Sequence, residues 1–215
     1  MIAQGAETFY VLEEHADKAA VTQIEIPPNM PQRGNALTRM IGRAILGAIG
    51  WKITGALPNE KKVIVVGGPH TSNLDFVLAM ATMLALGLRF SYMMKKEAFD
   101  NPLGGLFRWL GGVEIDRKAP RDVTAQMNDW FHTQDKAWLG ITPEGTRGKV
   151  EKFKKGYLRI AQTTGAPLFV VGINAPTKEV VLDKLWPLTG DEDADNQRVQ
   201  DYLLNRFTGV KPENQ

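Results

Sequence analysis

The sequence predicts an α/β fold in which a mostly parallel central sheet carries helices on both faces, preceded by an N-terminal amphipathic helix. Short apolar runs rich in β-branched residues, such as residues 63–66 and 167–173, have the length and composition of buried strands. Longer segments between them repeat apolar residues every three or four positions, as helices do. This alternation is typical of a parallel sheet that is covered on both faces.

Composition is that of a globular protein with a substantial core. The chain has 215 residues, of which 43% are apolar and 23% charged, and we expect an N-terminal arm over 1–36 followed by one domain over 37–215. A net charge of +2 argues against nucleic acid as a partner, and the absence of cysteine excludes thiol nucleophiles and zinc–thiolate sites. We see no signal peptide and no apolar run of the ~20 residues that span a bilayer.

Each element follows from a local pattern. Apolar runs ending at turn residues predict the strands, which are 63–66, 90–94, 113–115, 137–141 and 167–173, with a further short strand at 22–26. Helical spacing, an early proline or a closing glycine predicts the helices, which are 37–57, 76–88, 102–110, 122–133, 157–164 and 199–207. The acidic residues 190–198 are predicted to form a loop.

The first helix, residues 37–57, has two interpretations. Its apolar stripe is clear, while Arg39, Arg43 and Lys52 lie largely off that stripe, and no acid occurs from 27 to 59. A basic amphipathic helix can lie in a membrane interface. The same stripe is equally expected of a helix that packs on the core with a solvated basic edge.

Polar clusters follow three of the predicted strands, at 70–75, 116–117 and 144–147. The carboxyl ends of parallel strands share one edge of a sheet, so we expect these clusters to meet in one crevice. His70 is the natural general base, and Asp75 on its other ring nitrogen would orient and strengthen it. An alternative is that Ser72 and Asp75 form a capping box that closes the next helix.

The other clusters indicate an anionic substrate. Arg117 and Arg147 have the planar geometry that grips phosphate, and Glu144, Gly145 and Thr146 form a hinged, polar turn directly after an apolar strand. The alternative for each is an ordinary surface ion pair. The lysine-rich stretch 149–155 is either a solvated loop or a docking surface for an acidic carrier or phospholipid heads.

Two further chemistries are not favoured by the residues. Ser72 lacks the G-x-S-x-G elbow of a serine nucleophile. The spacing of His70, Asp75 and Glu144 matches no common ligand pattern, so we predict no metal site.

Taken together, these motifs resemble those of the glycerolipid acyltransferases, the 1-acylglycerol-3-phosphate acyltransferase family. Four family motifs occur in order across about half the chain, as His70-TSNL-Asp75, the GGVEIDR stretch at 111–117, PEGTR at 143–147 and APLFVVGI at 166–173. The resemblance implies transfer of a fatty acyl group from an acyl thioester to the free hydroxyl of a lysophospholipid such as 1-acylglycerol 3-phosphate.

The same resemblance implies a role for each site residue. His70 would remove the hydroxyl proton and Asp75 would support it, without an acyl-enzyme. Arg117, Glu144, Gly145, Thr146 and Arg147 would bind the polar head, and the Gly145 amide is one candidate oxyanion donor. Residues 76–88 and 103–110 are candidates for the lining of an acyl channel.

The implied partners are an acyl-CoA or acyl carrier protein as co-substrate and a lysolipid acceptor, with no cofactor. Separately, the basic side chains Arg39, Arg43 and Lys52 lead us to expect contact with a membrane surface. The expected location is cytoplasmic, at the inner face of the cell membrane. The alternatives are the same transfer to another acceptor, an aminoacyl lysolipid or glycerol 3-phosphate, or a non-catalytic protein that binds lipid or acyl carrier.

Overall fold

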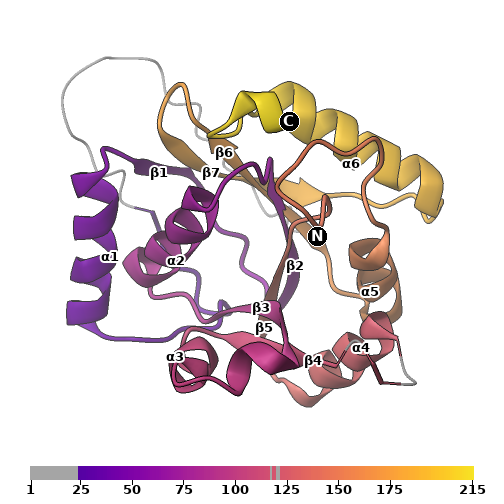
Figure 1. The fold of residues 1–215 in the computed structure, drawn as a ribbon, viewed down its shortest axis with the longest axis horizontal. Helices are drawn as coiled ribbons and strands as arrows, with labels where there is room; N and C mark the ends of the chain where they lie inside the picture. The colour runs from indigo at the N-terminus through magenta and orange to yellow at the C-terminus, as the bar shows by residue number, and fades with distance from the viewer. Residues whose placement is uncertain (1–23, 117, 120–121) are drawn as a thin grey trace, which may run out of the picture.

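The centre of the molecule is one seven-stranded sheet, seen in a computed structural model that describes residues 24–116, 118–119 and 122–215. The strands run in the order β1-β7-β6-β2-β5-β3-β4, and every neighbouring pair is parallel except β6 and β7 (Figure 1). Their bounds are β1 Lys52–Gly55, β2 Lys62–Gly68, β3 Phe90–Lys95, β4 Gly112–Ile115, β5 Ala137–Ile141, β6 Leu168–Asn174 and β7 Glu179–Trp186. The predicted fold class is confirmed.

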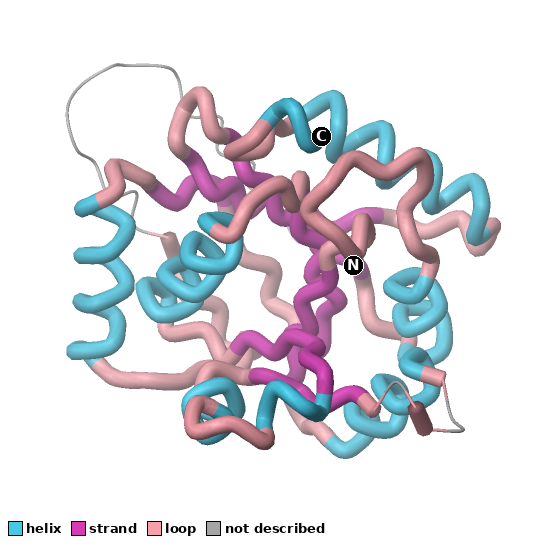
Figure 2. Tube along the Cα trace, in the orientation of Figure 1, coloured by secondary structure: helices cyan, strands magenta, loops and turns pink. Residues whose placement is uncertain are grey.

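Helices cover both faces of this sheet (Figure 2). Their bounds are α1 Ala36–Ala48, α2 Leu74–Leu86, α3 Gly104–Trp109, α4 Val123–Thr133, α5 Gly156–Thr164 and α6 Glu192–Arg206. Short 3₁₀ turns lie at Lys96–Phe99 (η1) and Pro212–Asn214 (η2). Successive side chains of a strand point to opposite faces, so β2 contributes to two separate cores.

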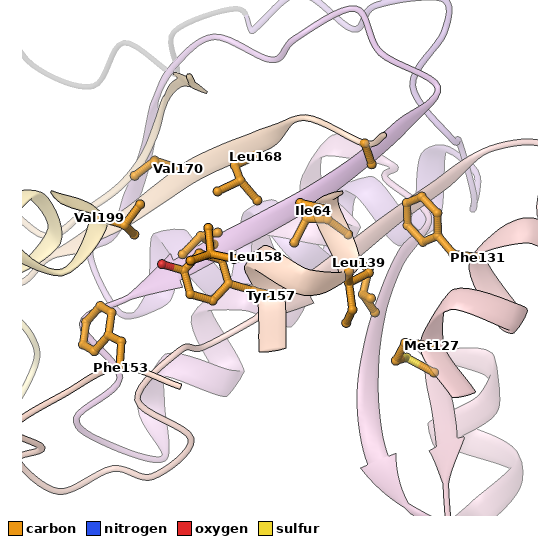
Figure 3. Close-up of a cluster of buried hydrophobic side chains, with 14 of the residues drawn as sticks. Ile64, Met127, Phe131, Leu139, Phe153, Tyr157, Leu158, Leu168, Val170 and Val199 are labelled. Carbon is orange, nitrogen blue, oxygen red and sulfur yellow. The ribbon is translucent and has the colours of Figure 1, made fainter. Parts of the chain in front are cut away.

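On one face, the sheet packs against α4, α5 and α6. Ile64 and Leu139 from the sheet meet Phe131 of α4, Tyr157 of α5 and Val199 of α6, and all five are almost fully buried (Figure 3). Burying an aliphatic or aromatic side chain of this size stabilises the fold by ~1.5–3 kcal/mol each. This packing fixes the direction of β2 and β5, the two strands that lead to the polar clusters.

On the other face, α2 lies on the sheet and α1 lies on α2. Val63 and Val65 of β2 pack with Met83 of α2. The contact between the helices centres on Gly42, where an added Cβ would lie 2.3 Å from the backbone nitrogen of Ala85. A glycine at this position therefore lets the two helix backbones approach closely.

The first predicted helix is too long, and only part of its apolar stripe faces the core. Helix α1 ends at Ala48, Gly50 has φ of +72°, and residues 52–55 form the edge strand β1. The buried residues of α1 are Gly42 and Leu46, whereas Leu37, Met40 and Ile41 are exposed. The core-packing interpretation therefore holds only for the C-terminal end of the stripe, where Ile45 and Ile49 pack against the core.

In the C-terminal third, one strand was missed and one prediction fails. Strand β7 was not expected, and its pairing with β6 and β1 completes the sheet. The predicted acidic loop at 190–198 is largely the start of α6, which Asp191 caps by accepting bonds from the amides of Asp193 and Ala194. Acidic residues in a first helical turn interact favourably with the helix dipole.

The predicted N-terminal arm is only partly described, because residues 1–23 lie outside the described residues. The remainder, from residue 24, lies against the domain: Met30 is fully buried and Arg33 donates its amide hydrogen to the Gly87 carbonyl. The described part of the strand predicted at 22–26 has no strand structure.

Candidate active site

The polar clusters after β2 and β5 lie side by side because these strands are parallel neighbours. Val66 near the end of β2 pairs with Ile141 at the end of β5, so the segments that follow these two strands leave the sheet side by side. His70 follows β2 directly, Asp75 lies in the first turn of α2, and Glu144 follows β5. As predicted, the carboxyl ends of the strands bring these residues to one edge of the sheet.

His70 and Asp75 form a pair. The Nδ1 atom of His70 lies 3.1 Å from Oδ2 of Asp75, and the two side chains are 23% and 4% exposed. The buried carboxylate therefore fixes the ring, and Nε2 is the nitrogen left for another molecule. A neutral imidazole held in this tautomer can accept a proton at Nε2.

Asp75 also organises the loop that carries His70. Its Oδ2 accepts hydrogen bonds from the amides of Thr71 and Ser72 at 2.7 and 2.8 Å, and its Oδ1 accepts one from the Ser72 hydroxyl at 3.1 Å. The bond to the Ser72 amide is one half of the alternative capping box. One carboxylate therefore closes the loop and contacts the imidazole at the same time.

The electrostatics of Asp75 keep it ionised. Burial acts to raise the pKa of Asp75, but the hydrogen bonds from His70, Ser72 and Thr71 outweigh burial, so the net pKa lies below its usual range. A carboxylate that stays charged near neutral pH can stabilise a protonated imidazole.

Glu144 contacts the backbone of His70. Its Oε1 accepts the His70 amide hydrogen at 3.0 Å, its side chain is buried, and Oε2 has no hydrogen-bond partner within the described part of the chain. Burial raises the pKa of Glu144 despite the opposing bond from the His70 amide. This position supports the His70 backbone and does not suit the predicted contact with a polar head.

A cavity of about 830 Å³ lies beside the His70–Asp75 pair. His70, Thr146 and Arg147 are among its polar lining residues, and the rest of the wall is mainly apolar. The apolar lining includes Ala79, Met83, Leu86, Trp138, Phe169 and Leu182. The cavity thus has polar residues beside His70 and a mainly apolar wall elsewhere.

Sequence comparison shows the family to which this chain belongs. A family model described as Acyltransferase matches residues 51–174, more than half of the chain. The chain belongs to this acyltransferase family. The matched region includes His70, Asp75 and Glu144, and comparison with curated proteins gives no match.

The fold of this acyltransferase resembles one solved structure. The crystal structure of the 1-acyl-sn-glycerophosphate (LPA) acyltransferase PlsC from Thermotoga maritima matches with a TM-score of 0.55 and 20% sequence identity. The match covers 78% of this chain and 75% of that chain. It supports the α/β architecture of the acyltransferase.

The structure brings some of the predicted binding residues together. Gly145, Thr146 and Arg147 line the cavity with His70. Arg117 lies outside the described residues, and its neighbour Asp116 binds Gln126 through backbone groups. The strand order places β4, which precedes Asp116, three strands from β2.

Two smaller expectations for the acyltransferase need correction. The Gly145 amide donates a hydrogen bond to the Thr142 carbonyl at 3.0 Å, so it is committed to the turn and unsuited to an oxyanion. Residues 103–110 do not line the cavity, and Leu103, Leu106 and Trp109 are exposed instead. Much of α2, from Phe76 to Leu86, does line the cavity, and its role as the wall of an acyl channel stays a prediction.

Sequence reasoning missed the residues outside the His70–Asp75 motif that hold the loop carrying His70. Thr71 is 2% exposed and is bound by Lys211 and Asn214, about 140 positions away in the chain. Neither residue belongs to a recognisable motif, and their approach depends on α6 crossing the sheet. No local pattern could have revealed this contact.

Proposed function

We propose that the protein transfers a fatty acyl group from an acyl thioester, carried by coenzyme A or acyl carrier protein, to the hydroxyl of a lysophospholipid such as 1-acylglycerol 3-phosphate. The observation that carries the proposal is the His70–Asp75 pair at the polar end of a large apolar cavity. The pair provides a base, and the cavity provides room for an alkyl chain next to it.

In the proposed reaction, Nε2 of His70 accepts the proton of the acceptor hydroxyl as its oxygen attacks the thioester carbonyl carbon. The tetrahedral intermediate then collapses, the carbon–sulfur bond breaks, and the imidazolium returns the proton to the departing thiolate. The products are an ester and a free thiol. Asp75 stabilises the imidazolium throughout, and no residue becomes acylated.

Arg147 is the described cation best placed for an anionic head group. It lines the same cavity as His70 and forms no salt bridge with the described residues. A guanidinium without a protein partner can bind phosphate in a bidentate manner. Glycerol 3-phosphate or an aminoacyl lysolipid are the alternative acceptors.

The test is turnover by the purified full chain with a panel of lysolipids and both thioester donors. We expect His70→Ala to lose ~10²–10⁴-fold in rate, the usual contribution of a general base, and Asp75→Asn to lose rate as well. Circular dichroism and thermal unfolding would confirm that both variants fold. Thioester binding without any His70-dependent product would instead identify a non-catalytic binding protein.

We also propose that the acyltransferase docks on the cytoplasmic surface of the cell membrane. Leu37, Met40 and Ile41 on α1 are exposed, as are Leu106 and Trp109 on α3. No helix in the described ranges is long and apolar enough to cross a bilayer. Exposed apolar side chains beside arginines are typical of helices that lie in the interface of an anionic membrane.

A further inference from the structure

The last residues of the chain lie against the loop that carries His70. After α6, residues 208–215 return over the loop between β2 and α2, and Figure 1 shows this yellow end of the chain close to that purple loop. The segment lies outside the region matched by the family, which ends at residue 174. Its contacts converge on Thr71, the residue that follows His70.

Three contacts fix Thr71. The amide of Lys211 donates to the Thr71 hydroxyl oxygen at 3.0 Å, and Nδ2 of Asn214 donates to the Thr71 carbonyl at 3.0 Å. Gly209 packs so closely that an added Cβ would lie 2.5 Å from Cγ2 of Thr71. Both the side chain and the main chain of Thr71 are therefore held by the C-terminal segment.

The C-terminal segment is itself anchored to the domain. The amide of Ala175, at the end of β6, donates to the Thr208 carbonyl at 2.8 Å. Gln215 accepts from the Gly209 amide and donates to the carbonyls of Leu204 and Phe207 at the end of α6. The contacts on Thr71 thus come from an ordered turn and not from a free end.

Glu144 completes the support from another direction. Its carboxylate binds the His70 amide, while the Thr71 amide binds Asp75. Glu144, His70, Thr71, Asn214 and Gln215 together line a cavity of about 10 Å³, which shows how closely these groups approach one another. The backbone groups of His70 and Thr71 are consequently held from three places in the chain. Glu144 accepts the His70 amide hydrogen, Asp75 accepts the Thr71 amide hydrogen, and Asn214 donates to the Thr71 carbonyl.

We propose that Lys211 and Asn214 are positioning residues for acyl transfer, acting through Thr71 on the orientation of His70. This inference rests on the function proposed above. The imidazole must stay aligned with Asp75 on one side and the acceptor hydroxyl on the other. A displacement of about 1 Å in such a site can cost ~10²-fold in rate.

Asn214→Ala, which removes the donor to the Thr71 carbonyl, tests the proposal in the full chain. Glu213→Ala is the matched control, since Glu213 belongs to the same turn and its exposed side chain has no partner in the described part of the molecule. Thr71→Val removes the acceptor for the Lys211 amide with little change in shape. Thr71→Ser restores that oxygen and serves as the conservative rescue.

We expect Asn214→Ala and Thr71→Val to lower kcat by ~10–100-fold with the KM for the thioester unchanged, measured well below the unfolding temperature of each variant. Thr71→Ser should recover most of kcat, and Glu213→Ala should match the wild type. A role in stability alone would lower the unfolding temperature and leave kcat of the folded enzyme unaltered, which would overturn the proposal.

Hydrogen exchange at the amides of residues 70–72 separates this proposal from the proposed function, because it needs no turnover. In Asn214→Ala we expect faster exchange confined to these amides, whether or not the wild type transfers acyl groups. Exchange equal to that of Glu213→Ala would reject the positioning role. Absence of turnover in the wild type, with local exchange still accelerated, would reject the acyl-transfer function alone.

Discussion

At the scale of single residues, two buried carboxylates of opposite character flank one histidine. Asp75 accepts four hydrogen bonds and its pKa is lowered, whereas Glu144 accepts one from His70 and its pKa is raised by burial. Because the pKa of Asp75 is lowered and that of Glu144 is raised, Asp75 is the carboxylate that stays charged near neutral pH. Glu144 contributes mainly an acceptor oxygen at a fixed place.

The raised pKa of Glu144 leads to a prediction about stability and pH. The folded protein holds the Glu144 proton more tightly than the unfolded chain, so ionisation costs stability as pH rises from the ordinary glutamate range through the raised pKa. Glu144→Gln keeps an acceptor for the His70 amide and removes that charge. We expect this variant to be more stable than the wild type at neutral pH by roughly 1 kcal/mol.

Thermal unfolding across a pH series checks this expectation. The advantage of Glu144→Gln should shrink as the solution is acidified below the ordinary glutamate range, where the wild-type carboxyl is protonated in both states. The contribution of Asp75 to the pH dependence of stability has the opposite sign. The stabilisation that its carboxylate provides is lost as pH falls through its lowered pKa. A Glu144→Gln variant that is less stable than the wild type at neutral pH would show that the carboxylate charge itself is required.

At the scale of elements, helix α1 illustrates what the sequence can and cannot predict. Its periodicity identified a helix, and local motifs identified His70, Asp75 and the turn at 144–147. The stripe could not reveal which face is buried, because Gly42, a residue with no side chain, makes the closest contact with α2. Strand β7 was missed for a related reason, since its half-exposed residues give no continuous apolar run.

The contact between α1 and α2 predicts opposite effects for two glycine substitutions in one helix. Gly42→Ala would place a methyl group against the backbone of α2 and should destabilise the fold by ~1–3 kcal/mol. Gly47→Ala meets no atom within 4 Å and should stabilise it by up to ~0.5–1 kcal/mol, because alanine favours the helix. Urea unfolding measures both. Equal effects would show that α1 does not pack as described.

At the scale of the whole molecule, the exposed apolar residues gather around helices α1 and α3. Arg33, just before α1, lies over the ring of Trp109 at the end of α3, with 5.1 Å to the ring centroid, so the two helices share one region of the surface. The basic stretch at 149–155 is partly neutralised elsewhere, where Lys155 pairs with Asp193 at 2.6 Å. The region around α1 is therefore the better candidate for membrane contact.

Flotation with anionic vesicles tests this membrane surface. We expect the full chain to float with the vesicles, less so at high salt because the arginine contribution is electrostatic. Met40→Glu, at a side chain that is 61% exposed, should reduce the bound fraction severalfold. Leu185→Glu, at an exposed leucine on β7, is the matched control. Equal binding of both variants, or none by the wild type, would reject the proposal.

The pairing of β1 with β7 has a consequence for synthesis on the ribosome. Strand β1 lies at the edge of the sheet, and β7 is its single neighbour, with Lys52 opposite Glu179. β1 is the first strand in the described part of the chain, and it cannot form its hydrogen bonds within the sheet until β7, far later in the sequence, has been synthesised. A nascent chain stalled at the end of the family-matched region would contain His70 and Asp75, but β1 would still lack the strand with which it pairs.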